Sequence, residues 1–195
     1  MEFEKSKTRE NLARTFAGEC QDGARYQFIS KQCENNGFQF LSQTFKILAK
    51  NEMSHAKAIY DLIVYYSNGE EYNIPIEAGF PFNDCAIPES IKRSVEIEEM
   101  EAKNIYTAFA KIAQDEGFVE ASELLTLITG VEDCHSKLLT EMYERYKNDL
   151  LYKQPKPTKW KCNQCGHEET AKQAWQTCPL CKMEQGYVMI DFADE

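Results

Sequence analysis

Apolar residues recur at alternating steps of four and three positions along four stretches of the chain, the spacing of one face of an α-helix. In residues 41–66 this face consists of Leu41, Phe45, Leu48, Glu52, His55, Ile59, Leu62 and Tyr66. In residues 121–146 it consists of Ala121, Leu125, Ile128, Glu132, His135, Leu139, Met142 and Tyr146. Each member of the second set lies 80 positions after its counterpart, which indicates that one helix is a copy of the other.

The other two stretches are related in the same way. The first face consists of Leu12, Phe16, Glu19, Gly23 and Tyr26, and the third of Ile91, Val95, Glu98, Ala102 and Ile105. Here the offset is 79 positions. The chain therefore contains an internal duplication of a helix pair.

Residues that tolerate a left-handed backbone stand between the predicted helices, where the chain must turn. They are found in Asn35-Asn36-Gly37, in Ser67-Asn68-Gly69 and at Gly117. Residues 70–88 contain three prolines and are predicted to form a long crossover between the two helix hairpins. Two short turns and one long crossover predict a mainly α fold, with a ferritin-like four-helix bundle over residues 1–150.

The sequence changes character after residue 150. Residues 151–159 include QPKPTK and are predicted to be a linker, and residues 160–195 are cysteine-rich and lack a helical pattern. Cys162-x-x-Cys165 and Cys178-x-x-Cys181 predict two knuckles whose four thiolates enclose one tetrahedral ion. Zinc ribbons and rubredoxin-type iron sites share this ligand set, so the spacing alone leaves both metals open.

Composition narrows the classes of function. A net charge of −10 argues against a nucleic-acid partner. The charged start MEFEKSKTRE is unlike a signal peptide, and no apolar run is long enough to predict a membrane span. Paired cysteines of the metal-binding type favour a reducing, cytoplasmic location. The remaining thiols, Cys20, Cys33, Cys85 and Cys134, show no pairing pattern, and small-residue packing is the simplest role for Cys20 and Cys134.

Glutamates interrupt all four apolar faces at matching heights. An unpaired buried carboxylate is costly, so Glu19, Glu52, Glu98 and Glu132 together predict bound cations. Two of the three histidines, His55 and His135, each follow one of these glutamates by three positions. Glutamate from two helices and Glu-x-x-His from the other two is the ligand set of two-metal carboxylate bundles, and mixed carboxylate and imidazole ligation favours iron or manganese.

Other polar residues are predicted to lie near the same site. Glu101 follows Glu98 by three positions and adds a carboxylate from the third helix. Tyr26 and Tyr106 can reach the same region, although core packing would also explain them.

These motifs resemble those of the rubrerythrin family over nearly the whole chain. The resemblance rests on FAGE ending at Glu19, the Glu52/His55 pair, Glu98-x-x-Glu101 before YTAFAKIA, Glu132-x-x-His135, and the C-terminal rubredoxin-like cysteine motif. Cysteine at positions 20 and 134 and the long 70–88 connection depart from the family pattern without removing a ligand.

The resemblance implies a function and roles for residues. In rubrerythrins the glutamate that matches Glu101 leaves one iron on reduction, and the histidine that matches His55 replaces it, while Tyr26 and Tyr106 match tyrosines that hydrogen-bond around the site. The family implies a cytosolic hydrogen peroxide reductase with two irons in the carboxylate site and one iron, or zinc in its place, in the tetracysteine site. Electrons would come from rubredoxin or an NAD(P)H-dependent reductase, and the protein would form a homodimer.

Two other hypotheses stay open at this point. One is a ferroxidase or iron-handling ferritin-like protein, which explains neither Glu101 nor the tetracysteine motif. The other is a non-enzymatic zinc-ribbon adaptor, which leaves the buried glutamates and histidines without a purpose.

Overall fold

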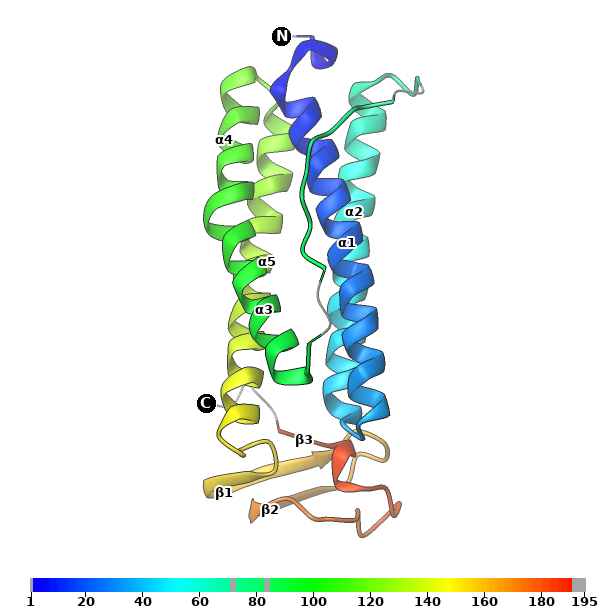
Figure 1. Ribbon diagram of the computed structural model, residues 1–195, viewed down its shortest axis with the longest axis vertical. Helices are drawn as coiled ribbons and strands as arrows, with labels where there is room; N and C mark the ends of the chain where they lie inside the picture. Colours follow the sequence, from blue (N-terminus) through cyan, green and yellow to red (C-terminus); the bar gives the residue numbers. More distant parts are fainter. Residues whose placement is uncertain (1, 71–72, 83–84, 191–195) are drawn as a thin grey trace.

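The structure, a computed structural model, describes residues 2–70, 73–82 and 85–190 and contains the predicted bundle (Figure 1). Helices α1 (Lys7–Asn35) and α2 (Gln39–Tyr66) form one hairpin. The other consists of α3 (Ile87–Met100), a π-helical segment η2 (Glu101–Ile105), α4 (Tyr106–Glu116) and α5 (Val119–Lys147). The connection after α2 runs back along the bundle to the start of α3, as the ferritin-like prediction requires. None of the described helices has the length and apolar character needed to cross a membrane.

The turns between helices fall at the predicted residues. Gly37, Asn68, Gly69 and Gly117 all have positive φ, the left-handed conformation that ends a helix. One boundary differs from the prediction: Pro88 lies in the first turn of α3 and not in the connection, because proline is favourable where a helix has no N–H to satisfy.

The first turn of α1 is capped from within the chain and from a distant helix. A 3₁₀ turn, η1 (Phe3–Lys5), precedes it, and the hydroxyl of Ser6 accepts a hydrogen bond from the Arg9 amide at 3.1 Å. Glu116, the last residue of α4, accepts from the amides of Lys7 and Thr8 at 2.9 and 2.8 Å. These contacts satisfy amides that a helix leaves unpaired and join the two hairpins at one end of the bundle.

The third helix contains an irregularity that the sequence analysis did not predict. In η2 the amide of Tyr106 donates to the carbonyl of Glu101, five residues back, so this turn holds one residue more than an α-helical turn. Tyr26 lies seven positions after Glu19, whereas Tyr106 lies eight after Glu98. The counterpart of Tyr26 is therefore Tyr106 and not Ile105, because the offset changes from 79 to 80 across the π turn.

The bundle has two apolar cores along its length. One, near the end where α4 meets α5, is built on Phe3, Leu12, Ile59, Phe109, Phe118, Leu125 and Ile128. The other, near the α1–α2 turn, is built on Ile29, Leu41, Phe45, Leu48, Ile91, Leu139 and Met142. The predicted glutamates and histidines lie in sequence and in space between these cores, which hold the four helices at a fixed separation around them.

The C-terminal region is a three-stranded antiparallel sheet of order β2-β1-β3, with strands β1 (Lys153–Cys162), β2 (Glu168–Gln173) and β3 (Val188–Ile190). Residues 153–159, expected to be a linker, are part of β1: Lys153 pairs with Gln173 and Thr158 with Ala171. The prolines are accommodated because the register shifts between those two pairs, where proline need not donate a ladder hydrogen bond. The small core of this sheet is centred on the fully buried Trp160.

The sheet lies at the end of the bundle where α1 turns into α2 (Figure 1). Gly186, in the 3₁₀ turn η3 (Gln185–Tyr187), contacts the backbone of that turn. A Cβ atom at position 186 would lie 1.7 Å from the carbonyl oxygen of Gly37, so only glycine fits there.

Replacing Gly117 with alanine is expected to destabilise the protein by about 1–2 kcal/mol, the cost of a side chain in the left-handed region. Gly117 has φ +90° and no atom within 4 Å of a built Cβ, so the effect isolates the backbone. Gly130→Ala is the matched control: Gly130 lies within α5 with equally open surroundings, and alanine there should stabilise by about 0.5–1 kcal/mol. Chemical denaturation measures both, and equal effects of the two changes would contradict the assignment of Gly117 as a left-handed helix end.

Candidate metal centres

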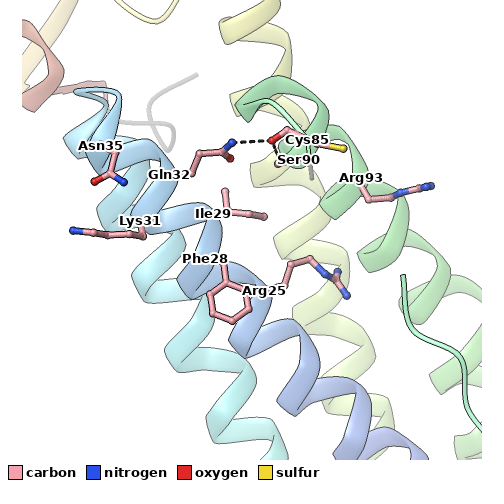
Figure 2. A pocket seen from close by; sticks show the side chains of 9 residues that line it. All are labelled: Arg25, Phe28, Ile29, Lys31, Gln32, Asn35, Cys85, Ser90 and Arg93. Carbon is pink, nitrogen blue, oxygen red and sulfur yellow. Dashed lines mark hydrogen bonds between the residues drawn. The ribbon is translucent and has the colours of Figure 1, made fainter. Parts of the chain in front are cut away.

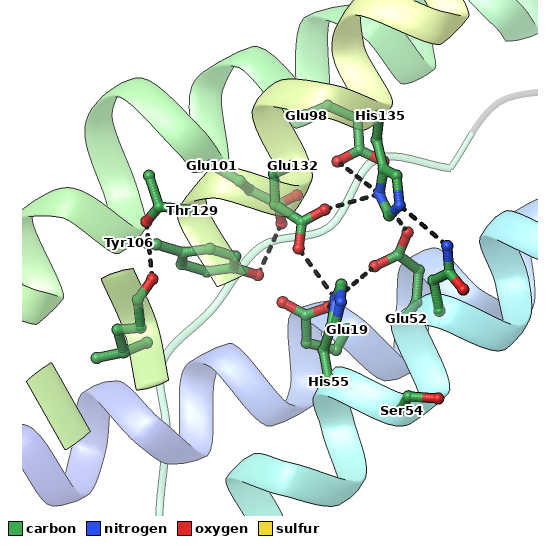
Figure 3. Close-up of polar contacts among 12 residues, drawn as sticks. Glu19, Glu52, Ser54, His55, Glu98, Glu101, Tyr106, Thr129, Glu132 and His135 are labelled. Carbon is green, nitrogen blue, oxygen red and sulfur yellow. Dashed lines mark hydrogen bonds and ion pairs between the residues drawn. The ribbon is translucent and has the colours of Figure 1, made fainter. Parts of the chain in front are cut away.

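Five glutamates from four helical rods are buried at the middle of the bundle. Their exposures are 2% for Glu19 and Glu52, 1% for Glu98 and Glu132, and 9% for Glu101. Figure 3 shows their side chains and the two imidazoles converging from all four rods. The helical spacing of three positions places Glu52 beside His55 on α2 and Glu132 beside His135 on α5, as predicted.

The two imidazoles present the same nitrogen to the carboxylates. Nδ1 of His55 lies 3.2 Å from Glu19, 3.2 Å from Glu52 and 3.1 Å from Glu132. Nδ1 of His135 lies 2.9 Å from Glu132, 3.1 Å from Glu52 and 3.8 Å from Glu98.

These atoms form two overlapping ligand groups. One consists of Glu19, Glu52, His55 and Glu132, and the other of Glu52, Glu98, Glu132 and His135, with the ligand atoms of each group within 4.8 Å of one another. Glu52 and Glu132 belong to both groups, so these two carboxylates can bridge a pair of cations.

The hydrogen-bonding state of the cluster fits cations. Several of its buried atoms lack a hydrogen-bond partner: Glu19 Oε1, Glu52 Oε1, Glu98 Oε2, both oxygens of Glu132 and His135 Nδ1. Buried polar groups are normally satisfied, and this concentration of acceptors around two points is what two divalent ions would complete.

Glu101 occupies a different place from the other glutamates. It belongs to neither four-atom group. Its carboxylate accepts a hydrogen bond from the hydroxyl of Tyr106 at 3.2 Å and is also hydrogen-bonded to Asp22. Because it lies on the π turn, directly after the helix that carries Glu98, Glu101 stands at the margin of the cluster.

Asp22 was missed by the sequence analysis. It is 4% exposed, pairs with Arg25 at 2.6 Å and is in contact with Glu101. A signal was present, since Asp22 follows Glu19 by the same three positions that relate glutamate to histidine on α2 and α5. It was overlooked because it precedes Gly23, the position that continues the apolar face.

Two tyrosines complete the polar layer in nearly symmetrical fashion. The hydroxyl of Tyr26 donates to Glu98, and Tyr106 contacts Glu101 and Glu19. Both rings are almost fully buried, so the hydroxyls are fixed against the carboxylates and do not serve packing alone.

Burial and mutual repulsion shift the acid–base equilibria of the cluster. Burial raises the pKa of Glu19 to about 8 and holds those of Glu98 and Glu101 well above the ordinary value. Burial opposes the charge on His55, but hydrogen bonds to Glu132, Glu19 and Glu52 outweigh it and raise the pKa of His55 to about 12. Without metal the cluster therefore holds protons in the places that cations would take.

Two hollows differ in what they can reach. A groove of about 460 Å³ between α1 and the start of α3, lined by Arg25, Phe28, Gln32, Cys85 and Arg93 among others, contains none of the predicted ligands (Figure 2). A smaller hollow of about 100 Å³ is lined by Gly18, Phe80, Glu101 and Tyr106. Only the smaller hollow brings outside molecules to the carboxylate cluster, and its size admits small ones.

The four predicted cysteines of the C-terminal domain come together. Sγ of Cys162 lies 3.7 Å from that of Cys181, and Cys165 is equally far from Cys178. Each pair forms a tight turn closed by a backbone hydrogen bond, with positive φ at Gly166 in one and at Lys182 in the other. The other four cysteines form no disulfide in the described structure.

A ferritin-like bundle with a two-metal carboxylate cluster, joined to a tetracysteine domain, defines a narrow class of metalloprotein. The sequence matches the rubrerythrin family over residues 10–143 and 89–174. It is 31% identical over 186 residues to a rubrerythrin of Clostridium perfringens, covering 95% of this chain and 94% of the relative. It is 29% identical to a rubrerythrin of Nitratidesulfovibrio vulgaris, covering 90% of each. The chain belongs to the rubrerythrin family.

Solved structures agree on the fold. Nigerythrin in its fully reduced, all-ferrous state superposes with a TM-score of 0.64 at 22% identity, covering 98% of this chain and 94% of nigerythrin. A bacterioferritin of Mycobacterium tuberculosis gives a TM-score of 0.63 at 21% identity, covering 72% of this chain and 86% of that one. The family implies iron, and the carboxylate, imidazole and thiolate donors described above fit it.

Binding of Fe²⁺ to the carboxylate cluster is expected to release protons, and its affinity to rise as pH rises toward 8. The pKa of Glu19 lies at about 8 in the metal-free protein, so this carboxyl is largely protonated below that pH and must lose its proton to bind. Anaerobic calorimetry in buffers of different ionisation enthalpy, with the tetracysteine site already filled, counts the protons. Glu19→Gln should release fewer, whereas the exposed Glu120→Gln should match the unaltered protein. An affinity independent of pH between 6 and 8 would contradict the assignment.

Proposed function

We propose that the protein is a non-haem di-iron peroxidase that reduces hydrogen peroxide to water. The observation that carries this proposal is the position of Glu101, a buried carboxylate beside the two ligand groups but in neither of them, lining the one hollow that leads to the cluster. Such a carboxylate can join or leave the metal site without dismantling the bridges made by Glu52 and Glu132.

The proposed chemistry divides between metal and protein. Two ferrous ions held by Glu19, Glu52, His55, Glu98, Glu132 and His135, with Glu101 as a further ligand, would supply the two electrons that cleave an O–O bond. The protein keeps the ligands in place through its two apolar cores and admits only small molecules through the hollow.

The flanking groups are placed to assist. The hydroxyls of Tyr26 and Tyr106 donate hydrogen bonds to Glu98 and Glu101, and so can follow a change in charge at those carboxylates. His55 is the less enclosed of the two imidazoles, with 14% of its side chain exposed against 6% for His135. We therefore assign Glu101 and His55 the catalytic roles, with the two tyrosines as hydrogen-bonding partners.

The tetracysteine site is proposed to deliver electrons. Cys162, Cys165, Cys178 and Cys181 would hold one iron, for which zinc is the alternative, and tetrahedral thiolate iron changes geometry little on one-electron transfer. Electrons would reach it from rubredoxin or from an NAD(P)H-dependent reductase, in a cytoplasmic homodimer. The partial exposure of Cys165 and Cys181 supports this role, because a donor needs an accessible edge.

A ferroxidase or iron-storing function is the main competing hypothesis, and the likeness to bacterioferritin is the observation that favours it. That likeness covers the helical bundle but not the whole chain. It leaves the tetracysteine domain unexplained, and a zinc-ribbon adaptor would leave the carboxylate cluster unexplained. Glu101 distinguishes the two enzymes experimentally.

Glu101→Ala is expected to slow oxidation of the reduced protein by peroxide by about 10–100-fold, the range seen when a supporting group of a metal site is lost, while both metals still bind. Anaerobic stopped-flow mixing with peroxide and, separately, with dioxygen measures the preference between the two oxidants. Glu96→Ala, an exposed carboxylate on the same helix, is the control and should change neither rate. An unchanged preference in Glu101→Ala would favour the ferroxidase hypothesis.

Replacing Cys162 and Cys178 together with serine should abolish reductase-driven turnover but leave a single oxidation by peroxide intact, because the two electrons for that step reside in the carboxylate site. Comparing stopped-flow single turnover with steady-state peroxide consumption in one preparation separates the two. Cys134→Ser, at an exposed cysteine outside the cluster, should behave as the unaltered protein. Full steady-state turnover in the double variant would rule out the proposed electron path.

A further inference from the structure

The two imidazoles of the carboxylate cluster are held differently on their outer sides. Nε2 of His135 lies 3.3 Å from the side-chain amide of Asn51, as Figure 3 shows by the contact from His135 to α2. Nε2 of His55 makes no hydrogen bond to any group in the described part of the chain. Both rings direct Nδ1 at the carboxylates, so the difference lies only in what stands behind each ring.

The internal duplication makes this difference specific. Asn51 directly precedes Glu52, and the residue that directly precedes Glu132, 80 positions later, is Val131. Asn51 and Val131 therefore occupy equivalent positions on α2 and α5, and both are partly buried. If the halves were alike, residue 131 would support His55 as Asn51 supports His135. A valine side chain has no hydrogen-bonding atom, so that support is missing.

The chemistry of a ligating imidazole gives Asn51 a role. When Nδ1 binds a cation, Nε2 carries the proton and needs an acceptor. Asn51 supplies one when its carboxamide is turned so that Oδ1 faces Nε2, an orientation that the ring's protonation dictates. Such an outer partner fixes both the tautomer and the rotation of a ligating imidazole.

We infer that Asn51 is a positioning residue that fixes His135 as a permanent ligand, and that Val131, its counterpart, leaves His55 free to change its position. The two halves of the metal site then differ in rigidity although their ligands are alike. This inference rests on the proposed two-metal site but not on the identity of the oxidant, so it can fail or hold independently of peroxide reduction.

The test uses the full chain with Zn²⁺ in both the carboxylate and tetracysteine sites, and side-chain ¹⁵N NMR of the two histidines. In the unaltered protein, His135 should show a single tautomer with a slowly exchanging Nε2 proton, and His55 a rapidly exchanging one. Asn51→Val should make the Nε2 proton of His135 exchange at least about tenfold faster without altering His55, and Asn51→Asp, which keeps an acceptor, should restore it. Lys50→Ala, at an exposed neighbouring position, should change neither ring.

The reciprocal change asks whether the fixed half can be moved. Val131→Asn should slow exchange at His55, and the double variant Asn51→Val, Val131→Asn should transfer the protected signal from His135 to His55. Titration with Co²⁺, with zinc in the tetracysteine site, gives a second readout: Asn51→Val should weaken one of the two binding steps by about 10–100-fold and spare the other. If both steps weaken equally, or if His135 stays protected in Asn51→Val, Asn51 does not position this ligand and the inference is wrong.

Discussion

The constraint on which the rest of this structure depends is the burial of five carboxylates at the centre of one bundle. Uncompensated, such a cluster would drive the helices apart, because each charge is costly away from water and each repels its neighbours. Two apolar cores, one on each side, hold the helices at a fixed spacing, and protons or cations supply the opposite charge. Stability and metal chemistry are therefore two aspects of the same arrangement: the cores impose the proximity that makes the ligands avid.

Much of this arrangement could be predicted because it is written in local periodicity. The face that runs through Leu48, Glu52 and His55 has helical spacing, and its repetition around Glu132 shows that the glutamates are not isolated surface charges. A duplicated ligand pattern tells more than any single motif, since chance does not place the same exception at the same height twice.

What escaped prediction depends on contacts between distant residues or on a one-residue change of register. The prolines in residues 153–159 indicate a linker when considered alone, but pairing with β2 makes this stretch a strand. Asp22 stands one position off the apolar face, and only the fold shows that it meets Glu101 and Arg25. The π turn left a trace, the change in offset between the first and third helices, which is legible once Tyr106 is recognised as the partner of Tyr26.

The π turn also bears on how the two halves of the duplicated chain came to differ. A substitution can be reversed by another substitution, but the extra residue in Glu101–Ile105 shifts every later residue of that rod, and its removal would misalign α4 with its neighbours. A carboxylate gained on such an insertion is retained for reasons of geometry as well as of selection. The two copies were thereby released from evolving in parallel, and one could acquire chemistry that the other never shared.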